Sequence, residues 1–271
     1  MSIVKRYLLI LAMVFLSGCG VKKEIITAIL PSPTPTVTPT AKPTPDIEKL
    51  YGPCTNIRVL MYHHVQDEVI AKNSNTTSLT VTPDFFRKQM QYLKDKNYQI
   101  ITPGDLENFF NTGTKVPPKS VIITFDDGYK DNYTVAYPIL KEFGFKATIF
   151  ISTGHVNGAE YLSWDEIKEM SDLINFGNHT WSHHASAGPM TELEKEIETA
   201  DIQLREHGLN QDKIFAYPYG NSSIDAETVL NKLKYQLAFT TTYGKMMCVK
   251  KKFDLPRIRV GNAPLYKYGL D

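Results

Sequence analysis

The chain has 271 residues, of which 42% are hydrophobic and 22% are charged, and its formal net charge is +1. This is the composition of a globular protein, so neither wholesale disorder nor a fibrous repeat is expected. The balanced charge argues against nucleic-acid binding, which needs a clustered excess of Lys and Arg. Three cysteines are too few for a disulfide scaffold.

The first residues have the pattern of an export signal. Lys5 and Arg6 precede an apolar stretch over residues 7–15 that is too short to span a bilayer. The run Leu16-Ser17-Gly18-Cys19 follows and resembles the lipobox of bacterial lipoproteins, in which the cysteine is lipidated. The resemblance implies a signal peptide over residues 1–18 and an extracytoplasmic protein anchored to the bacterial cell membrane through Cys19. The alternative is an ordinary secretory signal with an incidental cysteine.

A proline- and threonine-rich segment separates this signal from the rest of the chain. Residues 31–46 hold six prolines and five threonines, a composition that indicates a stiff, extended spacer. At ~3.1 Å per residue, the spacer would hold a domain on the order of 50 Å from a membrane. We therefore assign residues 19–50 to a tether and residues 51–271 to one folded domain.

Beyond residue 56, short apolar runs alternate with amphipathic stretches. Seven or eight strand–helix alternations indicate an α/β fold with a parallel sheet, either doubly wound or closed as a barrel. A helix is predicted over residues 83–95 after Thr82 at the N-cap, and capping boxes at Ser163/Glu166 and Thr191/Glu194 predict two more helix starts. Strands are predicted over residues 57–62, 99–101, 121–125, 147–151, 173–176, 214–217, 237–241 and 258–260.

Residues capable of chemistry follow several different predicted strands. They are His63, the pair Asp126-Asp127, His179 and Tyr219. Barrel enzymes assemble their sites from such carboxyl-terminal strand ends, so this distribution favours the barrel.

The two carboxylates Asp126 and Asp127 end a β-rich run, and Gly128 permits a sharp turn after them. Successive side chains leave an extended backbone in opposite directions, so one carboxylate can bind a metal while its neighbour approaches from another side. The alternative is a simple Asp-Gly turn that closes a strand.

His179 and His183 are four residues apart. On one helical turn, this spacing aims both imidazoles at one point. The pair alone is a weak signal, and a solvated polar loop is the alternative. With one carboxylate, however, the two histidines make a three-ligand set that suits zinc or a similar divalent ion.

A third run, Tyr217-Pro218-Tyr219-Gly220, places aromatic rings after another strand. Such rings commonly stack on sugar faces, although a rigid loop packed on the core is an equal alternative.

Together, these three runs resemble the motifs of the NodB-type polysaccharide deacetylases, carbohydrate esterase family four. The likeness covers most of residues 56–262. It implies a distorted (β/α) barrel of the NodB-homology type with seven strands, and a divalent metal, zinc first with cobalt or nickel as alternatives. It also implies hydrolytic removal of acetyl groups from N-acetylated glycans such as poly-N-acetylglucosamine, peptidoglycan or chitin.

The resemblance assigns roles to individual residues. Asp126 matches the catalytic base, whereas Asp127, His179 and His183 match the metal ligands. Tyr219, after Pro218, matches the residue whose backbone N–H helps to stabilise the oxyanion.

Two departures from the family pattern affect further residues. The third motif usually begins with an arginine that braces the base, but Ala216 stands there, and Arg257 could replace it from another strand end. The late histidine that often serves as general acid is missing. The early run Leu60-Met61-Tyr62-His63-His64 resembles the branch that acts on poly-N-acetylglucosamine, in which a histidine near the first strand is the acid, and we match His63 to it. The alternatives are an ordinary surface ion pair for Arg257 and a structural histidine for His63.

Other residues carry weaker expectations. Trp181 lies between the two metal-matched histidines and either lines the site or packs in the core. Cys54 and Cys248 could pair outside the cell, but nothing in the sequence shows that they are close.

Two functions compete on the sequence alone. The first is a monomeric metal-dependent N-deacetylase with an acetylated glycan as its partner, and the second is a catalytically silent glycan-binding lipoprotein. Retention of the base and all three metal ligands favours the enzyme. Within enzymes, an O-acetyl esterase acting on xylan or another O-acetylated glycan stays open, because both reactions pass through the same tetrahedral intermediate.

Overall fold

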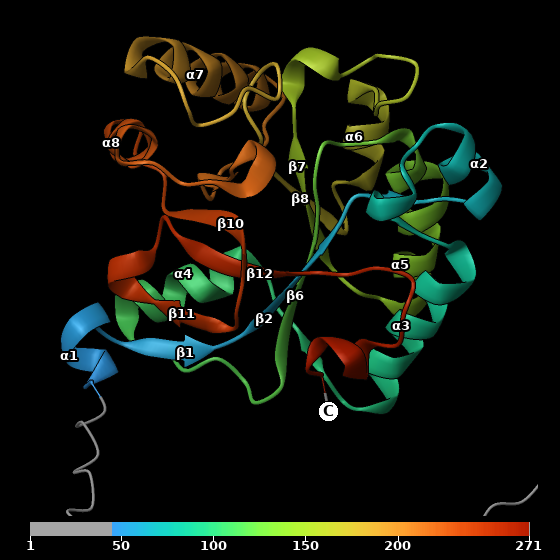
Figure 1. Cartoon of the computed structure of the whole chain (residues 1–271), viewed down its shortest axis with the longest axis horizontal. Helices are drawn as coiled ribbons and strands as arrows, with labels where there is room; N and C mark the ends of the chain where they lie inside the picture. The colour runs from blue at the N-terminus through green and yellow to red at the C-terminus, as the bar shows by residue number, and fades with distance from the viewer. Residues whose placement is uncertain (1–44, 271) are drawn as a thin grey trace, which may run out of the picture. The chain divides into compact units, whose positions relative to one another are not determined.

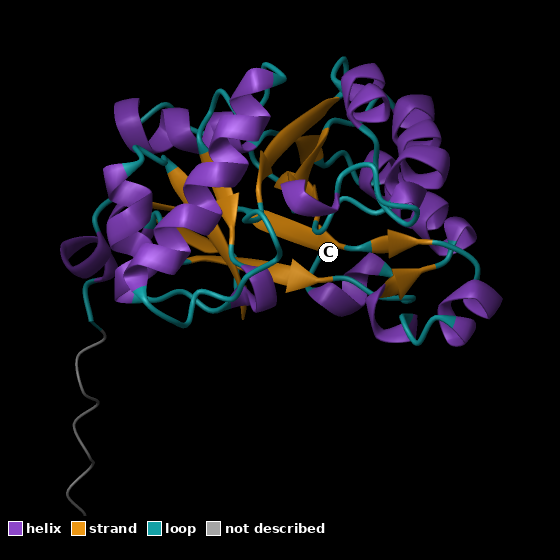
Figure 2. Cartoon of the chain, turned by 90° about the horizontal axis from the view of Figure 1, so that it is seen from above, coloured by secondary structure: helices purple, strands orange, loops and turns teal. Residues whose placement is uncertain are grey.

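A closed barrel of parallel strands organises the domain. The computed structural model describes residues 45–270, within a compact unit that begins at Pro45. Seven strands pair in the order β2-β12-β10-β9-β8-β7-β6, and pairing of β2 with β6 closes the ring. Figure 2 shows the strands in the interior with helices around them. The predicted seven-stranded (β/α) barrel is thus confirmed.

The barrel strands agree with the predicted ones to within two residues at each end, except that β12 begins at Leu255 rather than at the predicted residue 258. They are β2 (Arg58–Tyr62), β6 (Ser120–Phe125), β7 (Ala147–Ile151), β8 (Ile174–Asn178), β9 (Ile214–Ala216), β10 (Leu237–Tyr243) and β12 (Leu255–Arg259). A short strand, β5 (Gln99–Ile100), pairs with the first half of β6 and stands outside the ring. Two further pairs, which the sequence did not predict, are β1 (Cys54–Asn56) with β11 (Met246–Cys248) and β3 (His64–Val65) with β4 (Thr80–Val81).

Eight α-helices occur within residues 45–270 (Figure 1). They are α1 (Ile47–Tyr51), α2 (Glu68–Asn73), α3 (Pro83–Asp95), α4 (Pro103–Thr112), α5 (Tyr137–Phe143), α6 (Trp164–Met170), α7 (Met190–Glu206) and α8 (Ile224–Lys232). A π-helical turn over Asn132–Ala136 leads into α5, and single 3₁₀ turns follow β7 (Thr153–His155) and β9 (Pro218–Gly220). Residues 47–50, which the sequence pattern assigns to the tether, therefore form part of a helix.

Large apolar side chains from alternate strand positions fill the barrel. Val59, Ile122, Phe150 and Phe239 belong to one buried cluster. Glycine is required at position 177, because a Cβ there would lie 2.7 Å from the Phe150 ring. The opposite strand faces pack against the helices in two outer clusters, one of which includes α3 and α5 and the other α7 and α8. Burial of the strands on both faces explains why they are nearly continuous apolar runs in the sequence.

Helix α3 spans the predicted residues, and the predicted capping box at Ser163/Glu166 begins α6. The box predicted at Thr191/Glu194 is wrong, because α7 begins at Met190 with Pro189 at its N-cap. Thr191 therefore lies inside the first turn, where its hydroxyl cannot cap the helix.

A disulfide joins the start of the domain to the segment between β10 and β12. The antiparallel pairing of β1 with β11 sets Cys54 opposite Cys248, and their sulfur atoms are 2.06 Å apart. The sequence left this pair open, because the two residues are 194 positions apart. A cross-link that closes so long a loop restricts the unfolded chain strongly, so it stabilises the domain.

The signal peptide, the lipobox with Cys19 and most of the tether lie outside the described residues. Between residues 45 and 270, no helix has both the length and the apolar character needed to cross a bilayer.

Candidate active site

The residues predicted to carry chemistry meet at one end of the barrel. His63, Asp126, His179 and Pro218 each follow a strand, namely β2, β6, β8 and β9. Since all ring pairings are parallel, these carboxyl-terminal ends lie at the same mouth of the barrel.

Asp126 is bound by a buried arginine from the last strand. Arg257 Nη1 and Nη2 donate to the two Asp126 carboxylate oxygens, each at 2.7 Å. Arg257 is fully buried and donates further from Nη1 to Thr124 Oγ1 (3.2 Å) and from Nε to the Thr240 carbonyl (2.9 Å). Burial alone would raise the pKa of Asp126, but the charge and hydrogen bonds of Arg257, together with the charges of His179 and His63, outweigh burial and lower that pKa, so the carboxylate is ionised. The sequence suggested that Arg257 could replace the arginine that is missing at position 216. In the structure, Arg257 does contact Asp126.

Asp127, His179 and His183 form a group that could hold a metal ion. Their candidate ligand atoms all lie within 4.8 Å of one another. Asp127 Oδ1 lies 3.3 Å from His179 Nε2 and 3.1 Å from His183 Nε2. Burial raises the pKa of Asp127, but His179 and His183 in their protonated forms, which donate to the carboxylate, outweigh burial and hold that pKa well below its usual range.

The hydrogen bonding of His179 shows that this group suits a cation. His179 Nδ1 lies 2.7 Å from the Ala216 carbonyl, which can only accept, so Nδ1 carries a hydrogen. In a neutral ring, Nε2 then presents a lone pair toward Asp127 Oδ1, a buried oxygen without an aligned donor in the described part of the chain. Two acceptors at this distance repel unless a positive charge lies between them. One carboxylate with two imidazole nitrogens is a donor set that zinc and its neighbours bind.

The two histidines converge through a loop rather than through the predicted helical turn. No helix covers residues 179–189, and Thr180 and His183 adopt left-handed φ values of 64° and 61°. Three hydrogen bonds hold the loop: Asn178 Oδ1 accepts from Thr180 N at 2.8 Å, Thr180 Oγ1 from His184 N at 2.9 Å, and the Ile151 carbonyl from His179 N at 3.0 Å. The i, i+4 spacing therefore predicted correctly that the two imidazoles meet, but the predicted helical turn is wrong, because a loop brings them together.

His63 and His64 face different surroundings, as expected for neighbours at a strand end. His63 is 8% exposed, and burial lowers its pKa to about 4 against the opposing influence of Asp126 and Asp127. His64 Nδ1 instead lies 2.6 Å from Asp131 Oδ2, and its ring stacks on Tyr129 with the centroids 3.7 Å apart. Of the two histidines, His63 is thus the one whose pKa is influenced by the Asp126 and Asp127 carboxylates.

The three residues predicted to bind substrate differ in their placement. Tyr219 is 68% exposed, and its ring lies edge-on to His183 with the centroids 4.7 Å apart. Its φ of 59° and the φ of 81° at Gly220 turn the chain sharply after buried Pro218. Trp181 is 42% exposed and accepts from Gly154 N through its carbonyl at 2.7 Å, so it lies in the loop beside the site rather than in the core.

Sequence reasoning missed two residues that surround the site. Tyr129 stands two positions after Asp127, and burial first, then the charge of Asp127, raises the pKa of its hydroxyl. Asp131 accepts from Val65 N at 2.8 Å and orients His64. Both lie in the run Gly128-Tyr129-Lys130-Asp131, directly after Asp126 and Asp127. Their position next to these carboxylates in the sequence could have identified them as residues near the site.

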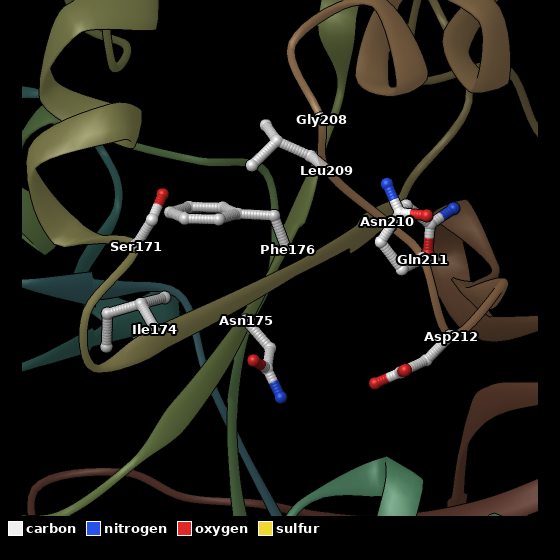
Figure 3. A pocket seen from close by; sticks show the side chains of 9 residues that line it. All are labelled: Ser171, Ile174, Asn175, Phe176, Gly208, Leu209, Asn210, Gln211 and Asp212. Carbon is white, nitrogen blue, oxygen red and sulfur yellow. The ribbon is translucent and has the colours of Figure 1, made fainter.

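A separate hollow lies away from these residues (Figure 3). It has a volume of about 200 Å³ and involves the beginning of β8 and the segment that precedes β9. This position is the amino-terminal end of the strands, opposite the mouth that holds Asp127. It is lined by Ser171, Ile174, Asn175, Phe176, Gly208, Leu209, Asn210, Gln211 and Asp212.

Comparisons with known proteins identify the class of enzyme to which this barrel and its candidate site belong. Residues 113–238 match the model of a family described as polysaccharide deacetylase. The chain is 33% identical over 205 residues to YxkH of Bacillus subtilis, whose name places it among polysaccharide deacetylases; the match covers 74% of this chain and 70% of that protein.

A second relative is the poly-beta-1,6-N-acetyl-D-glucosamine N-deacetylase of Staphylococcus epidermidis. It is 26% identical over 262 residues, which cover 88% of this chain and 90% of that protein. Among solved structures, the Streptococcus pyogenes deacetylase PplD in complex with acetate superimposes with a TM-score of 0.69 and 31% identity, over 76% of this chain and 92% of that one.

The chain belongs to the polysaccharide deacetylase family, the NodB-type carbohydrate esterase family four. The resemblance of the three motifs is therefore confirmed, as is the prediction of an enzyme of the N-deacetylase class.

We expect Arg257→Met to lower the free energy of unfolding by about 3–5 kcal/mol at neutral pH, because it leaves the Asp126 carboxylate buried without its partner. Asp126→Asn combined with Arg257→Met should be less destabilised, since a neutral amide needs no counter-charge. Urea denaturation of the metal-free protein measures both. Exposed Arg259, on the same strand, supplies the control Arg259→Met, and an equal loss in that variant would contradict the assigned pairing.

Proposed function

We propose that this chain is a metal-dependent N-deacetylase of an acetylated envelope polysaccharide. The observation that carries the proposal is the buried ion pair of Asp126 with Arg257 next to the Asp127-His179-His183 group. Arg257 keeps the Asp126 carboxylate ionised and fixed in orientation beside the candidate metal ligands. A member of the polysaccharide deacetylase family needs both of these features for catalysis of this kind. The relative that acts on poly-beta-1,6-N-acetyl-D-glucosamine supports that polymer as the first substrate to test.

Asp127, His179 and His183 would hold the ion, and zinc is the first choice for a carboxylate with two imidazoles. When bound, a divalent ion polarises the acetyl carbonyl and makes water a better nucleophile. Asp126 accepts the proton of the attacking water, and the backbone N–H of Tyr219 donates to the oxygen on which negative charge develops. Exposed Tyr219 and Trp181 offer rings to the sugar faces.

Breaking the C–N bond requires a proton on the leaving nitrogen. With its pKa at about 4, His63 is neutral in the resting site at neutral pH. His63 must therefore gain a proton during turnover before it can protonate the leaving nitrogen. The source of that proton is the attacking water, whose proton Asp126 accepts first. The overall balance is water plus amide giving acetate plus the protonated amine.

Acetate release from a panel of glycans tests the proposal. We expect the detergent-solubilised chain to release acetate and an equal amount of new amine from poly-N-acetylglucosamine oligomers, to lose activity after chelation, and to recover it with zinc, cobalt or nickel. Asp126→Asn should keep its metal and lose about 10²–10⁴-fold in rate, whereas exposed Asp172→Asn should change neither. Acetate released from O-acetylated xylan alone would make the chain an esterase, and binding of glycan without acetate release would make it a silent module.

A second experiment separates the roles of the adjacent histidines. We expect His63→Ala to reduce N-deacetylation by about 10²-fold or more but hydrolysis of an activated acetyl ester much less, because that leaving group needs little protonation. His64→Ala should lower the unfolding temperature, since it removes the partner of Asp131, but retain the rate per folded molecule. Equal losses on both substrates for His63→Ala, or a catalytic loss confined to His64→Ala, would disprove the role given to His63.

We also propose that the chain is a lipoprotein held at the extracytoplasmic side of the membrane by Cys19 and the proline-rich tether. The sequence supports this proposal, because the run Leu16-Ser17-Gly18-Cys19 is followed by the proline- and threonine-rich segment over residues 31–46.

Cys19→Ala should move the protein from the membrane fraction to the soluble fraction, since lipidation needs the thiol. Its activity on soluble oligosaccharides should be unchanged, because the site lies in the separate folded domain. Fractionation and immunoblotting measure the shift, and Cys19→Ala that stays with the membrane would rule out this anchor.

A further inference from the structure

A buried polar chain runs from α7 to the loop that carries the metal-matched histidines. It starts at Asp201 on α7, which is 4% exposed and accepts from Lys213 Nζ at 2.7 and 2.6 Å. The Tyr235 hydroxyl donates to Asp201 Oδ1 at 3.2 Å and accepts from Asn178 Nδ2 at 2.6 Å. Tyr235 and Asn178 are 1% and 0% exposed. All three side chains are thus withdrawn from solvent and bonded in series.

The bonds fix the orientation of the Asn178 amide. Its Nδ2 group donates to Tyr235 Oη and also to the Ile197 carbonyl at 3.0 Å. Both amide hydrogens are therefore engaged, and Oδ1 must be the acceptor that faces Thr180 N at 2.8 Å. A rotated amide would place its NH₂ group against the N–H donor of Thr180 and its oxygen against the Ile197 carbonyl, so the observed orientation is the favourable one.

The oriented amide acts on the loop that follows it. Thr180 is buried and has a left-handed φ of 64°, a conformation that is unfavourable for a β-branched residue. Its N–H bond to Asn178 holds this turn, and its own hydroxyl accepts from His184 N at 2.9 Å. His179 and His183 lie directly beside these two anchor points, so the direction of both imidazoles depends on them.

We propose that Tyr235, bonded to Asp201 and acting through Asn178, is a positioning residue for the metal site. Among residues 45–270, no contact joins it to any of the three metal-matched residues, and it sets the turn that aims His179 and His183 at Asp127. The inference rests on the proposed metal site. Groups that orient metal ligands through hydrogen bonds commonly change metal affinity by 10- to 100-fold when removed.

Tyr235→Phe removes only the hydroxyl and leaves the ring packed on Phe215. We expect its zinc dissociation constant, measured by competition with a chromogenic chelator, to rise by about 10-fold or more. The visible spectrum of the cobalt-substituted protein should also change, because it reports the geometry of the ligands. Tyr62→Phe is the matched control: this hydroxyl is equally buried and donates to Gln89 Oε1 at 3.0 Å, away from the histidine loop.

A double-mutant cycle tests whether Tyr235 acts through Asn178. The losses in zinc affinity for Tyr235→Phe and Asn178→Ala should be clearly less than additive in the double variant, since the second change removes a link already broken. Urea denaturation of the metal-free proteins shows whether each variant folds, and Tyr235→Phe alone suffices should Asn178→Ala fail to fold.

The outcomes separate this inference from the proposed function. If the unaltered protein binds no divalent ion, the proposed metal site itself is wrong. If it binds zinc and Tyr235→Phe binds zinc as tightly with an unchanged cobalt spectrum, or if Tyr62→Phe loses as much affinity, the positioning role is wrong. An additive cycle would show that Tyr235 does not act through Asn178.

Discussion

The ion pair between Asp126 and Arg257 is the constraint on which the catalytic end of the barrel depends. In the closed ring, β12 and β6 flank β2, and the guanidinium of Arg257 on β12 reaches the carboxylate that follows β6. A buried carboxylate needs a partner of opposite charge, and a bidentate arginine also fixes the plane of the carboxylate. Closure of the barrel therefore also fixes the orientation of the Asp126 carboxylate.

Several residues in and beside the site lie in strained backbone. Asp127, Thr180, His183 and Tyr219 all have positive φ values, from 59° to 73°, although none is glycine. Such conformations cost on the order of 1–3 kcal/mol each and persist only where neighbouring contacts enforce them. For Asp127, the strain has a direct result: its backbone turns away from the strand direction, so its carboxylate meets the histidines while Asp126 meets Arg257. Adjacent carboxylates thereby acquire different partners.

Much of the fold could be predicted from the sequence, because the strands are buried on both faces and stand out as apolar runs bounded by turns. The residues after those runs could be placed at a common end, since parallel strands of a barrel share one. Tertiary hydrogen bonds were beyond reach: the Ala216 carbonyl that fixes the tautomer of His179 has no side-chain signature. The same holds for the loop of His179 and His183, whose spacing matches a helical turn that the backbone does not form. Pairing of Cys54 with Cys248 depends on β1 meeting β11, which brings together residues from the two ends of the domain.

The adjacent residues His63 and His64 have different surroundings because they differ by one position along the chain. Side chains alternate between the two faces of a strand, so consecutive histidines cannot both face the barrel interior. His64 is committed to Asp131 and Tyr129, and His179 and His183 are committed to Asp127. His63 alone responds to both Asp126 and Asp127 without an ion pair to either among the described contacts. An amine leaves only when protonated, whereas an alcohol of low basicity can leave without help. In the proposed mechanism, His63 therefore bears on the choice between N-acetyl and O-acetyl substrates more directly than Asp127, His179 and His183, which both reactions would use.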